Sequence, residues 1–277
     1  MSKRLPVSHY IKNLKLVERN SEWLRADGIS NSDKAAYYGH IVTSYMKGDR
    51  SVKYLGNRFY FDNIATPLNL QNYPYEISKK ILSNMDKSPR SVLDIGGNIG
   101  QFSITMNRVL NGKAVIDVFE PNQHAMEILK KNIKKLSKIR TYQYGLGEKT
   151  YKKFLYFDPL RSGIGSVIKD NAGATDSLLK QEIDITNDVA SLTKRSHYDL
   201  VKIDVEGYEF HAIKGLKNII MDYLFIELSG QGRTKDYSHS DMLEAIRKQW
   251  GGFDIYYCGG LNKVIDTFDI LIKFRKA

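Results

Sequence analysis

The 277-residue sequence contains a single cysteine, Cys258, so a framework of intrachain disulfides is excluded and a reducing compartment is expected. No stretch of about 18 apolar residues occurs, so the sequence predicts no membrane-spanning helix. The first residues are mixed and polar, without the apolar core of a secretory signal peptide. We therefore expect a cytoplasmic protein.

Acidic residues are in deficit: 31 Asp and Glu face 42 Lys and Arg, which gives a formal net charge of +11. Such a charge suggests nucleic acid or an anionic surface as a partner. However, no aromatic residues interleave with the main basic run, as a surface that stacks single-stranded bases would require. We interpret the run as a solvated helix face and expect no stable nucleic-acid partner; its members are Lys130, Lys131, Lys134, Lys135, Lys138 and Arg140.

The first 75 residues carry two helical patterns, at about 10–24 and 30–46, and then a hairpin-like segment at 51–62 with its turn at Gly56-Asn57. We predict that residues 1–75 form an N-terminal helical and β-hairpin extension. Its expected roles are to cover a substrate cleft or to support a homodimer.

From residue 90 onward, short apolar runs alternate with helical patterns, and a further helix is expected at 75–85. This alternation predicts a parallel sheet with helices on both faces. The last two strands have no room for a crossover helix between them, so they are predicted to form an antiparallel hairpin. The expected strands lie at 91–95, 115–119, 141–146, 200–205, 223–228, 253–258 and 268–274, and the helices between them at 101–110 and 123–139.

Residues 76–277 are therefore predicted to form a Rossmann-like α/β domain with a seven-stranded, mostly parallel sheet and an antiparallel C-terminal hairpin. This is the layout of class I methyltransferases, and simple dinucleotide dehydrogenases lack the reversed hairpin. An insert at about 149–197 is long for a link between strands of this fold. We predict that it forms a flap over the acceptor cleft, with Ser162 and Ser166 contacting the substrate.

The strongest local signal is the run from Val92 to Gly100, where a buried strand leads through a glycine-rich turn into a helix. Its spacing, Asp-x-Gly-Gly-Asn-x-Gly, differs from the Gly-x-Gly-x-x-Gly of pyrophosphate binders. S-adenosylmethionine has no phosphates, and its α-ammonium could be bound by Asp94 directly or through water. The cofactor-binding residues predicted here are Asp94, Gly96, Gly97, Asn98, Gly100 and Phe102.

Glu120, followed by Pro121, ends the second predicted strand, where an acidic residue can accept hydrogen bonds from both ribose hydroxyls. Small residues around Leu146, after the third strand, leave room for an adenine ring. Glu120, Pro121 and Leu146 complete the predicted nucleoside site, and Asp204 of the fourth strand is a further predicted cofactor contact.

Lys202, Asp204 and Glu206 alternate along the fourth strand and should point to one face. Three such charges are costly to bury unless they pair with one another or meet a ligand. Glu227, at the end of the fifth strand, should reach the same carboxyl edge of the sheet. We therefore expect functional carboxylates there; the alternative is an internal Lys–carboxylate network that only holds the loop.

Several ordered motifs between about residues 90 and 275 resemble the FkbM-type methyltransferases. They are Asp94-Ile-Gly-Gly-Asn-Ile-Gly-Gln-Phe-Ser103, Phe119-Glu-Pro121, Ser162-Gly-Ile-Gly-Ser166, Val201-Lys-Ile-Asp-Val-Glu-Gly-Tyr-Glu209 and Phe225-Ile-Glu-Leu228. One departure is Gly97, where the family more often has alanine. The resemblance implies S-adenosylmethionine-dependent O-methylation of a sugar in a glycan or glycolipid, or of a natural-product hydroxyl.

A hydroxyl is a poor nucleophile at neutral pH, so a base or a metal ion is expected. The candidate bases are Asp204, Glu206 and His239, the last in the loop after the fifth strand. Asp204, Glu206 and Glu227 could instead bind Mg²⁺ through oxygen ligands. Lys202 and Tyr208 are further expected substrate contacts.

Three other functions compete with this prediction. The glycine spacing and the C-terminal hairpin argue against a nicotinamide-dependent dehydrogenase. A nucleic-acid (RNA) methyltransferase would suit the basic charge, although no Asn-Pro-Pro-Tyr or Asp-Pro-Pro-Tyr motif occurs. A non-catalytic binding protein is disfavoured because the candidate carboxylates occur together.

Overall fold

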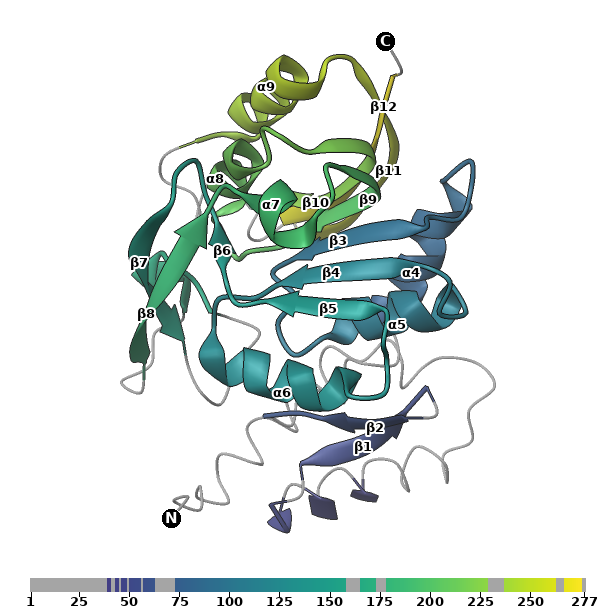
Figure 1. Cartoon of the computed structure of the whole chain (residues 1–277), viewed down its shortest axis with the longest axis vertical. Helices are drawn as coiled ribbons and strands as arrows, with labels where there is room; N and C mark the ends of the chain where they lie inside the picture. The colour runs from purple at the N-terminus through teal and green to yellow at the C-terminus, as the bar shows by residue number, and fades with distance from the viewer. Residues whose placement is uncertain are drawn as a thin grey trace.

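The computed structural model describes residues 39–40, 43–44, 46–48, 50–55, 57–62, 73–157, 165–172, 178–228, 237–262 and 267–275. Its main sheet has seven strands in the order β11-β12-β10-β9-β3-β4-β5 (Figure 1). The bounds are β3 (Ser91–Ile95), β4 (Val115–Phe119), β5 (Ile139–Tyr142), β9 (His197–Ile203), β10 (Ile220–Leu228), β11 (Phe253–Asn262) and β12 (Thr267–Phe274).

Neighbouring strands from β5 to β10 pair in parallel, whereas β12 runs antiparallel to both β10 and β11. The predicted Rossmann-like sheet with a reversed C-terminal hairpin is therefore confirmed. No helix in the described part of the chain is long and apolar enough to cross a membrane.

Helices cover both faces of this sheet (Figure 1). The helices α4 (Tyr73–Ser83), α5 (Gln101–Val109) and α6 (Gln123–Ile133) lie on one face, and α7 (Val189–Thr193), α8 (Glu209–Gly215) and α9 (His239–Trp250) on the other. Strand β3 is buried along its whole length, with Val92 in one core and Leu93 and Ile95 in the other. Side chains that alternate along a strand point to opposite faces, so a central strand needs apolar residues at successive positions.

Two elements differ from the sequence prediction. The helix expected to reach residue 139 ends at Ile133, because the chain must turn there for Ile139 to pair with β4. The strand expected at 141–146 is divided between β5 and the short β6 (Gly145–Leu146), which leaves the main sheet to join a smaller one.

The smaller sheet has the order β6-β8-β7, with β7 (Tyr151–Phe157) antiparallel to β8 (Leu179–Thr186). It stands beside the carboxyl ends of β4 and β5 (Figure 1). A short 3₁₀ helix, η3 (Lys169–Ala172), lies between its strands in the sequence, and a bridge joins Tyr156 to Ser166. Strands β7 and β8 both lie within the insert that was predicted at about 149–197.

The N-terminal hairpin is formed by β1 (Ser51–Tyr54) and β2 (Asn57–Tyr60). Tyr54 pairs with Asn57, so Asn57 is a strand residue and the predicted turn was wrong by one position. The helix predicted at about 10–24 lies outside the described residues, whereas the described residues between 39 and 46 are helical.

The hairpin packs on the core domain through both apolar and polar contacts. Its buried residues share one hydrophobic core with α5 and α6. Asn132 of α6 accepts from Tyr60 N at 2.6 Å and donates to the carbonyls of Tyr60 and Ile99. The predicted boundary at 75/76 falls within α4, so the division into extension and domain stays a prediction.

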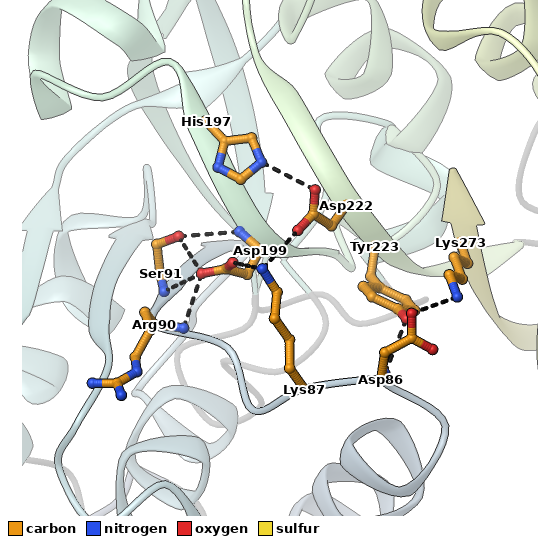
Figure 2. Close-up of polar contacts among 9 residues, drawn as sticks. All are labelled: Asp86, Lys87, Arg90, Ser91, His197, Asp199, Asp222, Tyr223 and Lys273. Atoms are coloured by element: carbon orange, nitrogen blue, oxygen red, sulfur yellow. Dashed lines mark hydrogen bonds and ion pairs between the residues drawn. The ribbon is translucent and has the colours of Figure 1, made fainter. Parts of the chain in front are cut away.

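A polar network links the amino ends of the central strands (Figure 2). One carboxylate oxygen of Asp199 in β9 accepts hydrogen bonds from Arg90 N and from both the amide and the hydroxyl of Ser91, at 2.8–2.9 Å. The ammonium of Lys87 lies 3.6 Å from Asp199 and 3.7 Å from Asp222. This network ties the start of β3 to β9 at the end of the sheet opposite the glycine-rich turn.

Replacing Asp199 with alanine should lower the free energy of unfolding by about 2–4 kcal/mol at neutral pH, because three donors lose their acceptor. Burial alone would raise the pKa of Asp199, but the hydrogen bonds from Arg90 and Ser91 and the charge of Lys87 lower it overall. The stabilisation is therefore present at neutral pH and is lost as the pH falls through the lowered pKa. Urea denaturation between about pH 7 and pH 3 measures both effects.

Asp222→Ala is the matched control, since Asp222 lies in the same network but pairs with the half-exposed His197 and the exposed Lys87. It should cost less than about 1 kcal/mol. If the two variants lost the same free energy of unfolding, the proposed contribution of the hydrogen bonds to Asp199 would be contradicted.

Candidate active site

A cavity lies at the carboxyl ends of β3, β4, β9 and β10, and residues of the smaller sheet complete its wall. Most of the predicted site residues line it. They are Gly96, Gly97, Asn98, Phe102, Glu120, Pro121, Leu146, Lys202, Asp204, Glu206, Tyr208 and Glu227. The structure thus brings together residues that are up to 131 positions apart (96 to 227).

Gly96 follows β3 with a φ of +80°. A Cβ atom at this position would lie 1.9 Å from the backbone oxygen of Asp204, so the turn after β3 touches the loop after β9. A hydrogen bond of 3.1 Å from Asp204 N to Ile95 O joins the same two segments. Glycine is required here by a neighbouring backbone as well as by any ligand.

The other two glycines of the motif have different neighbours. A Cβ on Gly97 would lie 2.0 Å from Cγ1 of Val118 in β4. Gly100, with a φ of +94°, is the N-cap of α5, and its Cβ would lie 2.6 Å from Leu129 of α6. Gly100 does not line the cavity, so its predicted cofactor contact is replaced by a packing role.

Glu120 directly follows β4 and is 7% exposed. Its two carboxylate oxygens accept hydrogen bonds from Asn98 N and Asn122 N, each at 2.8 Å. Burial raises the pKa of Glu120 to about 7, although the two amides and Lys202 oppose the rise. Each oxygen keeps a second acceptor position, so the rigidly held carboxylate can accept two further hydrogen bonds from a ligand.

Asp94 is fully buried and does not line the cavity. One oxygen accepts a hydrogen bond from Ser103, and the other lies 3.3 Å from the ammonium of Lys202. Because this side chain is buried, the predicted direct contact between Asp94 and a ligand's ammonium is corrected, whereas the predicted contact through water stays a prediction. Asp94 instead serves as a partner of Lys202.

Lys202 lies at the centre of this network. Its ammonium donates to Gly96 O at 3.1 Å and lies 3.3 Å from Asp204. Burial would lower the pKa of Lys202, but the carboxylates of Asp204 and Asp94 raise it overall, so the group stays charged. The alternative that lysine and carboxylates hold the loop internally thus applies to Lys202, which was also predicted to contact substrate.

Asp204 and Glu206 lie in the loop after β9, and both line the cavity. Glu206 has a φ of +53°, which is uncommon for a residue other than glycine. The predicted substrate contact Ser166 is buried, and its hydroxyl donates to Glu206 O at 2.8 Å. Ser166 therefore joins the insert to this loop rather than facing a substrate, and Ser162 lies outside the described residues.

Tyr208 lines the cavity from the end of the same loop and is 6% exposed. Its hydroxyl is hydrogen-bonded to that of Tyr151, and Lys153 donates to it at 3.3 Å while lying 4.3 Å above its ring. Burial raises the pKa of Tyr208, so its hydroxyl stays protonated. Tyr208 thus links β7 of the insert to the loop after β9.

Glu227 and Asp269 face each other across β10 and β12, and both line the cavity. Asp269 was not predicted; the only signal was an acidic residue within an apolar strand. Among the described residues, no three His, Cys, Asp or Glu side chains are grouped closely enough to hold a metal ion. The structure therefore does not assemble the predicted ligands Asp204, Glu206 and Glu227 into a metal site.

His239, a predicted base, is the first residue of α9, and its ring contacts the ring of Phe268 edge-on at 5.0 Å. It does not line the cavity. The sequence also missed the apolar wall of the cavity, since which insert residues face inward depends on how β7 and β8 pair. This wall includes Ile77, Phe119, Leu155, Val167, Ile183 and Ile185.

Residues 94–251, more than half of the chain, match the model of the methyltransferase FkbM domain. The chain belongs to the FkbM methyltransferase family. The match extends from the glycine-rich turn to the end of α9, so it includes Glu120 and the loop after β9. Asp269 of this FkbM-type chain lies beyond the matched residues.

The chain is 24% identical over 163 residues to Methyltransferase 1 of Beauveria bassiana, spanning 50% of this chain and 64% of that relative. The chain therefore covers less than two thirds of the length of this curated relative. Similar solved structures include precorrin-6y C5,15-methyltransferase of Geobacter metallireducens (12% identity, 72% of this chain, 89% of that one, TM-score 0.42). Fibrillarin of Aeropyrum pernix with bound S-adenosyl-L-methionine is another (11%, 80%, 81%, TM-score 0.44). Likeness at this level concerns the overall fold alone.

Gly97→Ala should lower the free energy of unfolding by about 1–3 kcal/mol, because the new methyl group meets Val118. In a double-mutant cycle, Val118→Ala should relieve that contact, so that the double variant loses less than the sum of the two single losses. Gly96→Ala combined with Val118→Ala is the control. Its two losses should add, since a methyl group at position 96 would meet the backbone of Asp204 and not Val118. Denaturant unfolding measures all variants, and additivity at Gly97 would contradict the clash.

Proposed function

We propose that this protein is an S-adenosylmethionine-dependent O-methyltransferase. The observation that carries the proposal is the placement of Glu120, a buried carboxylate held by two backbone amides at the cavity beside the glycine-rich turn. Membership of the FkbM family supports the reaction class.

The residues present fit this cofactor. The two remaining acceptor positions of Glu120 match the two neighbouring hydroxyls of a ribose. Among the residues that the structure describes, the cavity is lined by one ammonium, that of Lys202, and by five carboxyl groups: Glu120, Asp204, Glu206, Glu227 and Asp269. This excess of acidic groups favours a ligand with a sulfonium and an ammonium over a dinucleotide with a pyrophosphate, which disfavours a dehydrogenase.

When bound, S-adenosylmethionine would supply an activated methyl group, so the protein's task is mainly alignment and proton removal. Glu120 would hold the ribose, and Leu146 would contact the adenine from the wall of the cavity. Asp204 or Glu206 would accept the proton from the acceptor hydroxyl. We favour a carboxylate base over Mg²⁺ because the candidate ligands are not grouped around one point among the described residues.

The proposed acceptor is a hydroxyl of a sugar, glycan, glycolipid or natural product. Several carboxylates beside an apolar wall suit a polyhydroxylated molecule, because each carboxylate oxygen can accept from a hydroxyl. This inference rests on the family resemblance together with the composition of the cavity wall.

An RNA acceptor is the second candidate. It is favoured by the basic residues from Lys130 to Arg140, which are exposed at the end of α6 and the start of β5. The carboxylate-rich cavity argues against an RNA acceptor, because its carboxylates would repel the phosphates next to the nucleotide that accepts the methyl group.

Incubation with methyl-labelled S-adenosylmethionine and separate fractions of glycans, lipids, small metabolites and RNA tests the proposal. We expect label in an alkali-stable ether of a hydroxyl-bearing carbohydrate, lipid or small molecule. Label in RNA would support the second candidate, and absence of both binding and transfer would overturn the proposal.

Cofactor affinity should depend on pH because the ionised form of Glu120 is the better acceptor for ribose hydroxyls. Since the pKa of Glu120 in the free protein is about 7, Kd should increase by up to about tenfold for each pH unit below 7. Above pH 7 the dependence on Glu120 should level off. Calorimetry over this range measures it, and Glu120→Gln should bind weakly at every pH; an equal pH dependence in that variant would contradict the assignment.

Asp204→Asn and Glu206→Gln separate the two candidate bases while keeping the size of each side chain. Loss of the base should lower kcat by about 10²–10⁴-fold and leave the cofactor Kd within a few-fold. Steady-state methyl transfer and calorimetry give both quantities. If neither variant loses turnover, proton removal by this loop is wrong.

A further inference from the structure

Glu209, the first residue of α8, is fully buried and does not line the cavity. Burial raises the pKa of its carboxyl group, against the hydrogen bonds it accepts from neighbouring amides. A buried carboxyl group is costly unless hydrogen bonds compensate for the lost water. The mechanism above gives this group no role, so its partners are informative.

The partners of Glu209 belong to the loop that carries the candidate bases. One oxygen accepts from Gly207 N at 2.9 Å and from Val205 N at 3.3 Å. The other accepts from the hydroxyl of Tyr237 at 3.1 Å, and that hydroxyl also lies 3.1 Å from Gly207 O. The loop from Asp204 to Tyr208 therefore wraps around the Glu209 carboxylate.

The backbone of this loop needs such support. Glu206 and Gly207 are consecutive left-handed residues, with φ of +53° and +96°. A residue other than glycine in this region costs on the order of 1–3 kcal/mol and persists only where its surroundings fix it. The amides on both sides of Glu206 are held by Glu209, and its carbonyl accepts from Ser166 of the insert.

We propose that Glu209 and Tyr237 are positioning residues that hold the loop so that Asp204 and Glu206 face the cavity. This inference rests on the proposed function. Tyr237 lies just before α9, and its ring stacks on Phe210 at 4.8 Å. Glu209 and Tyr237 thus connect the loop after β9 to α8 and to the segment that leads into α9.

Tyr237→Phe keeps the stacked ring and removes only the hydroxyl. Without the hydrogen bonds of this hydroxyl to Glu209 and Gly207, the loop should sample other conformations. We therefore expect kcat to fall about five- to tenfold while acceptor KM and cofactor Kd stay within about twofold. Hydrogen exchange at the Gly207 amide should become faster in the same variant.

Tyr198→Phe is the matched control. Tyr198 is likewise buried, and its hydroxyl donates to Asp117 at 2.8 Å, away from the cavity lining. Tyr198→Phe should lower thermal stability about as much as Tyr237→Phe does, but it should leave kcat unchanged. Glu209→Gln keeps an oxygen acceptor for the two amides, so it should retain more turnover than Glu209→Ala.

Unchanged kcat in Tyr237→Phe, or an equal loss of kcat in Tyr198→Phe, would overturn the inference. Failure of the proposed function shows separately, as absence of methyl transfer by the unmodified protein. In that event, unchanged exchange at Gly207 in Tyr237→Phe would still refute the claim that Glu209 and Tyr237 hold the loop.

Discussion

The structure depends on a buried ammonium at the carboxyl end of its sheet. Lys202 in β9 binds Asp94 of β3, Asp204 of the following loop and the carbonyl of Gly96. Isolated charges in a central sheet would be strongly destabilising, but each of these groups has an opposite charge or a dipole beside it. The pairing fixes the distance between the two loops at the carboxyl edge, and Gly96 lets their backbones touch.

The loop after β9 is the point where the rest of the molecule meets this network. The insert reaches it through Ser166 and Tyr151, and α8 reaches it through Glu209. The loop thus receives contacts both from the insert, which is distant in sequence, and from the helix that directly follows it. Its left-handed Glu206 is a local cost that these contacts offset, as is common where function requires a defined side-chain direction.

The chemical character of the cavity follows from the same arrangement. Among the described residues, Lys202 is surrounded by partners, and the other charged groups that line the cavity are carboxyl groups. Such a wall suits a cationic cofactor and an acceptor rich in hydroxyls. Asp117, although fully buried, is paired with Arg140 and Tyr198 and contributes nothing to the cavity. The basic surface of the protein and its acidic cavity are therefore separate features.

The sequence by itself determined the succession of strands and helices along the chain, the reversed hairpin, the glycine-rich turn and the place of Glu120 at the end of a strand, because these depend on local periodicity and on residues next to strand ends. Tertiary structure decided which polar groups reach the cavity. Asp94 and Ser166 are buried, His239 is the first residue of α9, and Asp269 lies opposite Glu227 on the neighbouring strand. These outcomes depend on strand register and on the path of the insert, which are set by contacts between residues distant in sequence.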